Sequence, residues 1–158
     1  MPVGSSRGLK GYGADTMAKM TLTFAEKCIR KIKLKAAEAG VDVSIAVVDD
    51  AGSLVAYART GEKRVGFGEK VAIAKAKTAV AFKKNTQSIR DQFASHPGNY
   101  NIIGLSAMYP GEFWVGPGGI PLILNGDLIG GVGVAGPSPE DIQTWVAKAL
   151  ENFSEEEI

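Results

Sequence analysis

Two lysines and a threonine, Lys75, Lys77 and Thr78, stand within an alanine-rich stretch over residues 72–79. A lysine close to a packing face needs either an anionic partner or a lowered pKa, because burial disfavours its charged form. Such a side chain can bind the carboxylate or propionate of a ligand. With Glu69 nearby in the chain, Lys75 can also serve as an acid–base group. The alternative interpretation is that the lysines extend along an otherwise buried helix to solvent.

Aromatic side chains crowd the segment just before a pair of glycines. Ligand pockets and subunit interfaces both favour aromatic residues beside flexible glycines. On a monomer such a segment would expose a large apolar patch, which a second subunit would cover, so we slightly favour the interface. The aromatic residues are Tyr100, Tyr109, Phe113 and Trp114, and the ligand-binding candidates in this region are Phe113, Trp114, Gly118, Gly119 and Pro121.

Residues 118–136 are rich in glycine and predict a β-hairpin. Asn125-Gly126 lies between two apolar runs and predicts a type I′ turn, because both residues tolerate positive φ. The returning strand carries four glycines, so a helix, another subunit or a flat ligand is expected to approach its backbone closely. Its Gly131-x-Gly133-x-x-Gly136 pattern matches a dinucleotide fingerprint only superficially, since no βαβ unit surrounds it.

The other chemistry-bearing residues argue against several classes of site. His96 is the only histidine and Cys28 the only cysteine, so the sequence predicts no Cys/His metal site. Cys28 is interpreted as a small packing residue. A net charge of +1 argues against broad binding of nucleic acid, and the apolar runs are too short to span a membrane. We therefore expect a cytoplasmic protein without nucleic-acid or membrane partners.

Hydrophobic periodicity places these residues on a series of helices and strands. A helix is predicted over residues 21–39, begun by a capping box of Thr23 and Glu26 and ended at Gly40. Residues 95–118 are expected to form a long functional loop with one short strand. Hairpin-connected strands with packed helices predict an α+β domain with an antiparallel sheet. The other predicted helices cover residues 68–83, 86–94 and 138 to about 153, and the first two strands cover 43–48 and 53–58.

Four motifs follow one another at compatible spacing through the body of the chain. They are Val-Ser-Ile-Ala-Val-Val-Asp from residue 43, Ala-Lys-Ala-Lys-Thr-Ala from 74, Gly-Gly-Ile-Pro from 118 and Ile-Gly-Gly-Val-Gly-Val-Ala-Gly from 129. This succession resembles the GlcG/HbpS-like haem-binding family, also called domain of unknown function 336, which is related to the C-terminal domain of PduO-type corrinoid adenosyltransferases. The resemblance implies a profilin-like fold, a sheet flanked by helices, that forms homo-oligomers. We expect a flexible arm over residues 1–20, one domain over 21–153 and an acidic tail over 154–158.

The resemblance implies two functions of different class. The first is a binding protein for haem or another flat anionic ring compound, in which Gly118 and Gly119 let the ring approach and Lys75 or Lys77 meets its carboxylates. In haem-binding relatives a histidine of the first helix can ligate iron, whereas this chain has Cys28 there and no histidine. The alternative is a small-molecule enzyme, such as a lyase acting on an aryl hydroxylamine, with Lys75 and Glu69 as acid–base groups. Binding is favoured because no catalytic dyad or metal cluster identifies a reaction.

Overall fold

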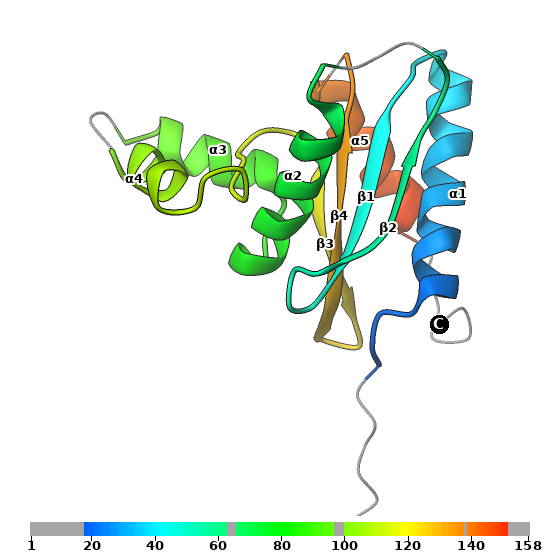
Figure 1. Ribbon diagram of the computed structural model, residues 1–158, viewed down its shortest axis with the longest axis horizontal. Coiled ribbons are helices and arrows are strands. Elements are labelled where there is room, and N and C mark those ends of the chain that lie inside the picture. The colour runs from blue at the N-terminus through cyan, green and yellow to red at the C-terminus, as the bar shows by residue number, and fades with distance from the viewer. Residues whose placement is uncertain (1–17, 63–65, 97–99, 138, 152–158) are drawn as a thin grey trace, which may run out of the picture.

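The computed structural model describes residues 18–62, 66–96, 100–137 and 139–151, which fold into one α+β domain (Figure 1). Four antiparallel strands form a sheet of order β2-β1-β4-β3, so the two hairpins lie side by side through β1 and β4. The predicted fold class is confirmed. Most of the predicted arm and all of the predicted tail lie outside the described residues. In chain order the elements are α1 (Leu22–Ala39), β1 (Ser44–Asp49), β2 (Leu54–Arg59), α2 (Gly68–Phe82), α3 (Thr86–Ala94), α4 (Asn101–Met108), β3 (Gly119–Leu124), β4 (Asp127–Ala135) and α5 (Pro139–Leu150).

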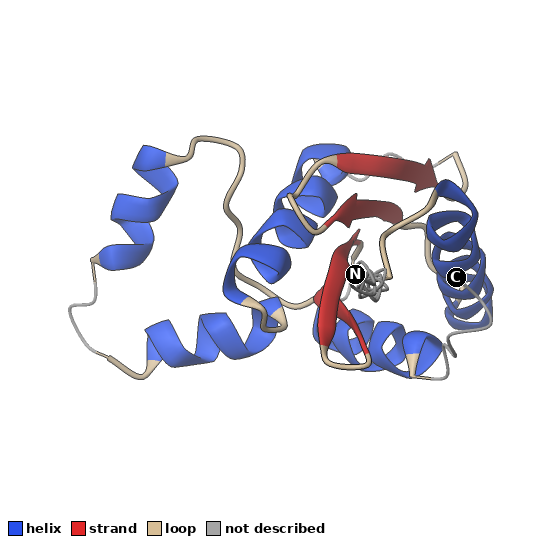
Figure 2. Cartoon of the chain, turned by 90° about the horizontal axis from the view of Figure 1, so that it is seen from below, coloured by secondary structure: helices blue, strands red, loops and turns tan. Residues whose placement is uncertain are grey.

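Helices cover both faces of the sheet (Figures 1 and 2). α1 and α5 pack on one face and α2 on the other, while α3 and α4 extend away from the sheet beyond α2. Along β1, Ile45 and Val47 join the large core under α1 and α5, whereas Ala46 and Val48 pack with residues of α2. Because both faces of β1 are covered, the strand is an almost continuous buried run rather than an alternation of polar and apolar residues.

The glycine-rich hairpin is present as predicted, and its close neighbour is a helix. Asn125 and Gly126 have φ of 50° and 86°, as a type I′ turn requires. On β4, a Cβ at Gly133 would collide with the carbonyl oxygen of Ala72 and lie 2.7 Å from the Ala76 nitrogen. The glycines therefore let the alanine face of α2 pack directly on the sheet backbone.

Helix ends follow local capping chemistry, with one correction. Thr21 is the N-cap of α1, since its Oγ1 accepts a hydrogen bond from the backbone nitrogen of Phe24 at 3.1 Å. The predicted capping box of Thr23 and Glu26 is therefore wrong, because Thr23 already lies inside the helix. Gly40 ends the helix with φ of 66°, as predicted. α5 ends at Leu150 rather than near residue 153, and its predicted cap at residue 138 lies outside the described residues.

The segment expected to be a long loop contains a helix, α4. Its sequence is largely apolar, and none of its residues is buried. A helix that packs one side on its own domain carries apolar residues on that side and polar residues on the other. α4 does not pack in this way and is largely apolar, so its sequence lacks the helical periodicity that would predict it. Ile103 and Met108 are exposed on α4, and Tyr100 and Tyr109 are exposed at its ends.

Candidate functional site

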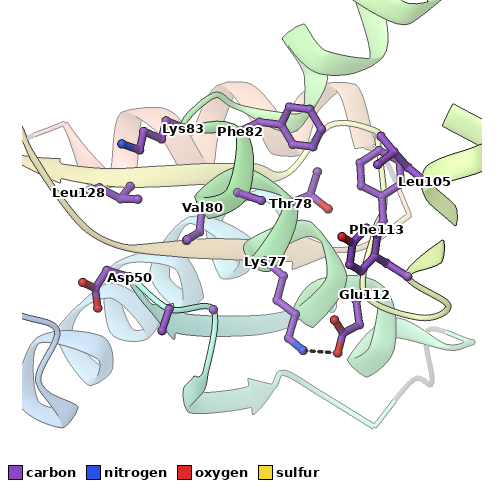
Figure 3. A pocket seen from close by; sticks show the side chains of 14 residues that line it. Asp50, Lys77, Thr78, Val80, Phe82, Lys83, Leu105, Glu112, Phe113 and Leu128 are labelled. Carbon is purple, nitrogen blue, oxygen red and sulfur yellow. Dashed lines mark hydrogen bonds and ion pairs between the residues drawn. The ribbon is translucent and has the colours of Figure 1, made fainter. Parts of the chain in front are cut away.

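A pocket of about 610 Å³ opens beside the C-terminal half of α2 (Figure 3). Three predicted ligand residues line it: Lys77 and Thr78 from α2, and Phe113 from the segment before β3. Gly52, in the turn between β1 and β2, and Leu128 of β4 complete other parts of the wall. Segments far apart in the sequence thus meet around one opening, which we call the ring pocket.

Apolar side chains form one wall of the ring pocket. The rings of Phe82 and Phe113 lie 5.9 Å apart between centroids, with their planes tilted by 44°. Leu105 and Tyr109, from α4 and its C-terminal end, extend this wall. Aromatic surfaces in this arrangement suit a flat apolar ligand, because they offer contact area at little cost in conformational entropy.

Charged side chains lie around the same pocket. Lys77 Nζ forms a salt bridge with Glu112 Oε1 at 3.1 Å, and both side chains are partly exposed. Lys83, at the C-terminal end of α2, supplies a second cation, and Asp50 lies on the side of the β1–β2 turn. Because the salt bridge is exposed, it holds the two side chains only weakly, and a ligand anion can displace Glu112 from Lys77.

Thr78 lines the ring pocket, but its hydroxyl is occupied by the protein itself. Oγ1 donates to the carbonyl oxygen of Ala74 at 2.7 Å and accepts from the backbone nitrogen of Trp114 at 3.0 Å. The side chain therefore ties the segment before β3 to α2. This contact fixes the position of the neighbouring Phe113.

A second cavity, of about 350 Å³, lies next to the N-terminal half of α2. Lys75 and Trp114 line it together with Arg90 of α3 and Glu140 of α5. Lys75 is only 3% exposed, and its Nζ donates to the carbonyl oxygen of Val134 at 2.9 Å. Burial lowers the pKa of Lys75 from its ordinary value of 10.5 to about 8, against the opposing charge of Glu140. We call this space the Lys75 cavity.

The glycines at the start of β3 donate backbone hydrogen bonds to side chains of α5 and α3. Gly118 nitrogen donates to Gln143 Oε1 at 2.7 Å, and Gly119 nitrogen donates to Thr86 Oγ1 at 2.8 Å. The Thr86 hydroxyl in turn donates to the carbonyl oxygen of Gly116. A Cβ at Gly119 would lie 2.7 Å from the Lys75 carbonyl oxygen, so this glycine permits close packing on α2. Gly118 has φ of 113°, and a Cβ there would lie 3.2 Å from Lys75 Nζ, so this position also requires glycine.

Thr86 and Gln143 were not singled out by the sequence, although both are buried and polar. Gln143 stands beside Ile142 on α5, and a polar residue that breaks an apolar helix face is a signal of a specific hydrogen bond. Thr86 follows the N-cap of α3, where a threonine is unremarkable. Only the folded chain brings it against residues 116–119.

The other sequence candidates lie apart from both cavities. Glu69 is exposed in the first turn of α2, and Pro121 lines other hollows, between β3 and α5. Cys28 is fully buried in the main core, as expected of a packing residue. His96 is exposed, and its Nδ1 lies 2.9 Å from the carbonyl oxygen of Gln92. The structure thus separates Lys77, Thr78 and Phe113 from Lys75 and Trp114.

Metal clusters and membrane-spanning helices are both absent from the described residues. Within residues 18–62, 66–96, 100–137 and 139–151, no group of three or more histidine, cysteine, aspartate or glutamate side chains is placed to hold a metal ion. None of the helices in these ranges combines the length and apolar character needed to cross a membrane.

Comparisons with known proteins agree with this fold. The chain is 34% identical over 142 residues to an uncharacterized 15.0 kDa protein in the dhaT–dhaS intergenic region of Citrobacter freundii, covering 90% of this chain and 97% of that protein. The crystal structure of Klebsiella pneumoniae protein ORFY, of the DUF336 family, superimposes with a TM-score of 0.75 at 28% identity, over 87% of this chain and 93% of that one. The crystal structure of a PduOC:heme complex gives a TM-score of 0.74 at 27% identity, over 85% and 94%.

The family model described as "haem degrading protein HbpS-like" matches residues 20–151, nearly the whole described body. The match includes α2, the glycine-rich hairpin and the segment that separates the two cavities. The chain therefore belongs to the HbpS-like family.

Proposed function

We propose that the protein binds haem or another flat anionic ring compound in the ring pocket. The observation that carries this proposal is the aromatic wall of Phe82 and Phe113 facing a pocket with two lysines, Lys77 and Lys83. A volume of about 610 Å³ suits a ligand larger than a simple metabolite. Membership in the HbpS-like family and the fold shared with a heme-bound relative support the same class of ligand.

The lysines are expected to meet the ring's carboxylates. Lys77 projects into the opening, where its present partner is Glu112 (Figure 3). A ligand propionate would replace that carboxylate on the ammonium, leaving Glu112 in solvent. The apolar face of the ring would lie along Phe113 and Phe82. An amphipathic ring would thus place its apolar part on the aromatic wall and its carboxylates on the lysines.

The ring pocket also fits iron, through one side chain. Among the residues lining it, Tyr109 is the side chain of a kind that ligates haem iron. Bound haem would supply redox and oxygen chemistry through its iron, and this chain would supply the position and the charge partners. Tyr109 is half-exposed at the C-terminal end of α4 and lines the pocket.

The same part of the molecule suits self-association. α4 buries none of its residues, and Ile103, Met108 and Tyr100 on and next to it are exposed. Exposed apolar patches of this kind are typical of interfaces. Because Leu105 and Tyr109 belong to both this apolar region and the ring pocket, a second subunit packed on α4 would also cover the pocket mouth. We therefore expect a homo-oligomer.

Titration with hemin and with metal-free protoporphyrin IX tests the proposal. We expect a shifted Soret band for hemin and quenched porphyrin fluorescence, with affinity at least ten-fold weaker in Phe113→Ala. Phe67→Ala is the matched control, because Phe67 is 82% exposed and lines neither cavity. Absence of both signals at micromolar ligand would overturn ring binding. Porphyrin binding unchanged by Tyr109→Phe, with an altered hemin spectrum, would assign the iron contact to Tyr109.

A further inference from the structure

The Lys75 cavity contains a buried cation without a counter-ion. Within the described parts of the chain, the ammonium of Lys75 makes one hydrogen bond, to Val134, and no salt bridge within 4.0 Å. An ammonium carries three N–H donors, and a buried charge normally has an ionic partner. Burial of this charge is costly, so apolar packing alone does not explain a lysine here.

The charged neighbours of Lys75 are already engaged with one another. Arg90 Nη1 lies 3.1 Å from Glu140 Oε1, and Arg90 Nη2 lies 3.0 Å from Asp91 Oδ1. Glu140 is close enough to favour the charged form of Lys75, but the two side chains are not in salt-bridge contact. An anion entering the cavity would therefore meet an ammonium that no protein carboxylate neutralises directly.

The remaining walls are apolar and indicate the kind of anion. Val71, Trp114 and Ala135 line the cavity around Lys75. A single negative charge matches the one unpaired ammonium, and Glu140 in the cavity wall repels a dianion such as phosphate about twice as strongly as a monoanion. The cavity is near the lower end of the roughly 300–1,000 Å³ usual for small-molecule sites.

We propose that the Lys75 cavity is a second ligand site, which binds a small organic monocarboxylate with its carboxylate on Lys75 and its apolar body against Trp114 and Val71. Phe113 and Trp114 are adjacent in sequence yet line different cavities, so this site is separate from the ring pocket. The inference therefore does not depend on ring binding.

Calorimetric titration with benzoate and with butyrate at pH 7 tests the proposal. We expect Lys75→Met to weaken binding at least ten-fold. Lys70→Met is the matched control, because Lys70 is exposed on the same helix and lines neither cavity. Equal binding by wild type and Lys75→Met, or no binding of either acid at millimolar concentration, would overturn the proposal. Tighter binding of inorganic phosphate than of both acids would overturn the assignment to monocarboxylates.

Two further measurements test the proposal without relying on Lys75→Met, which could bind weakly because it folds poorly. In wild type, affinity should fall by about a hundred-fold between pH 7 and pH 10, since the ammonium with a pKa of about 8 loses its proton in that range. Arg90 and Glu140 are the other charged residues that line the cavity, and Asp91 pairs with Arg90, so Lys75 is the group in it expected to lose charge here. A pH-independent affinity would contradict its role. Val71→Trp, which fills the cavity and retains Lys75, should abolish carboxylate binding but leave hemin binding intact. Retained carboxylate binding in this variant would place the site elsewhere.

Discussion

Replacing Lys75 with methionine should change how protein stability depends on pH. Lys75 is buried, and its pKa in the folded protein is about 8, against 10.5 ordinarily. Below about pH 8 both the folded and the unfolded chain carry the proton, and the folded state bears the full cost of a buried charge. Between the two pKa values the unfolded chain holds a proton that the folded chain has released. The free energy of unfolding therefore rises with pH in this window.

The expected size follows from the pKa difference. One pKa unit corresponds to about 1.4 kcal/mol, so the fall from 10.5 to about 8 corresponds to about 3 kcal/mol. Methionine removes that cost but leaves the Val134 carbonyl without its donor, which costs about 1 kcal/mol. Lys75→Met should therefore be more stable than wild type by about 2 kcal/mol at pH 7, and the two proteins should be about equally stable at pH 10.

Urea unfolding followed by circular dichroism at pH 7, 8, 9 and 10 measures this difference. Protein concentration must be the same throughout, because the stability of an oligomer depends on it. The two proteins share every other side chain, so the difference between their curves reports on Lys75. Lys70→Met should keep the wild-type pH dependence, since it retains Lys75. Parallel stability curves for wild type and Lys75→Met would refute the reasoning.

Three other changes test the packing and the assembly. Gly133→Ala should destabilise the domain by about 3 kcal/mol in urea unfolding, because the added Cβ would collide with α2. Gly104→Ala is the control: a Cβ at this position of α4 meets open space, so this variant should not be destabilised. Thr86→Val should cost about 2–4 kcal/mol by leaving the Gly119 nitrogen and the Gly116 carbonyl unpaired, and Thr86→Ser should restore most of that loss. Ile103→Asp should shift the mass measured by light scattering toward the monomer, while Ser106→Asp on the same helix controls for charge. An unchanged mass in Ile103→Asp would exclude α4 from the interface.

The sheet and its packing could be predicted because their signals are local. Asn125-Gly126 specifies its turn through positive φ, and α3 begins and ends where its sequence indicates. The glycines of β4 indicated a close approach, and the short side chains of α2 provide the partner. α4 could not be predicted in this way, since no residue of it is buried and so no periodic pattern marks it.

The sequence indicated several residues that line the two cavities, but not that they belong to two separate cavities. Lys77 and Phe113 were identified by type, and they do meet in one pocket. Lys75 lies two residues before Lys77, a step of about 200° around a helix, so the two side chains leave on different sides. The pocket's remaining walls come from the β1–β2 turn and from β4, whose approach depends on long-range packing. Neither Asp50 nor Leu128 carries a local signal of this role.

The glycine stripe and the buried lysine arise from the same packing. Gly131 and Gly133 have no side chains to hold α2 away from β4, so the helix backbone lies close to the strand at Ala72 and Ala76. Lys75 immediately precedes Ala76, and at this short separation its side chain ends at the Val134 carbonyl rather than in solvent. A helix held farther from the sheet would let the same lysine extend along its surface to water. The close approach that stabilises the domain thus also creates the charged wall of the Lys75 cavity.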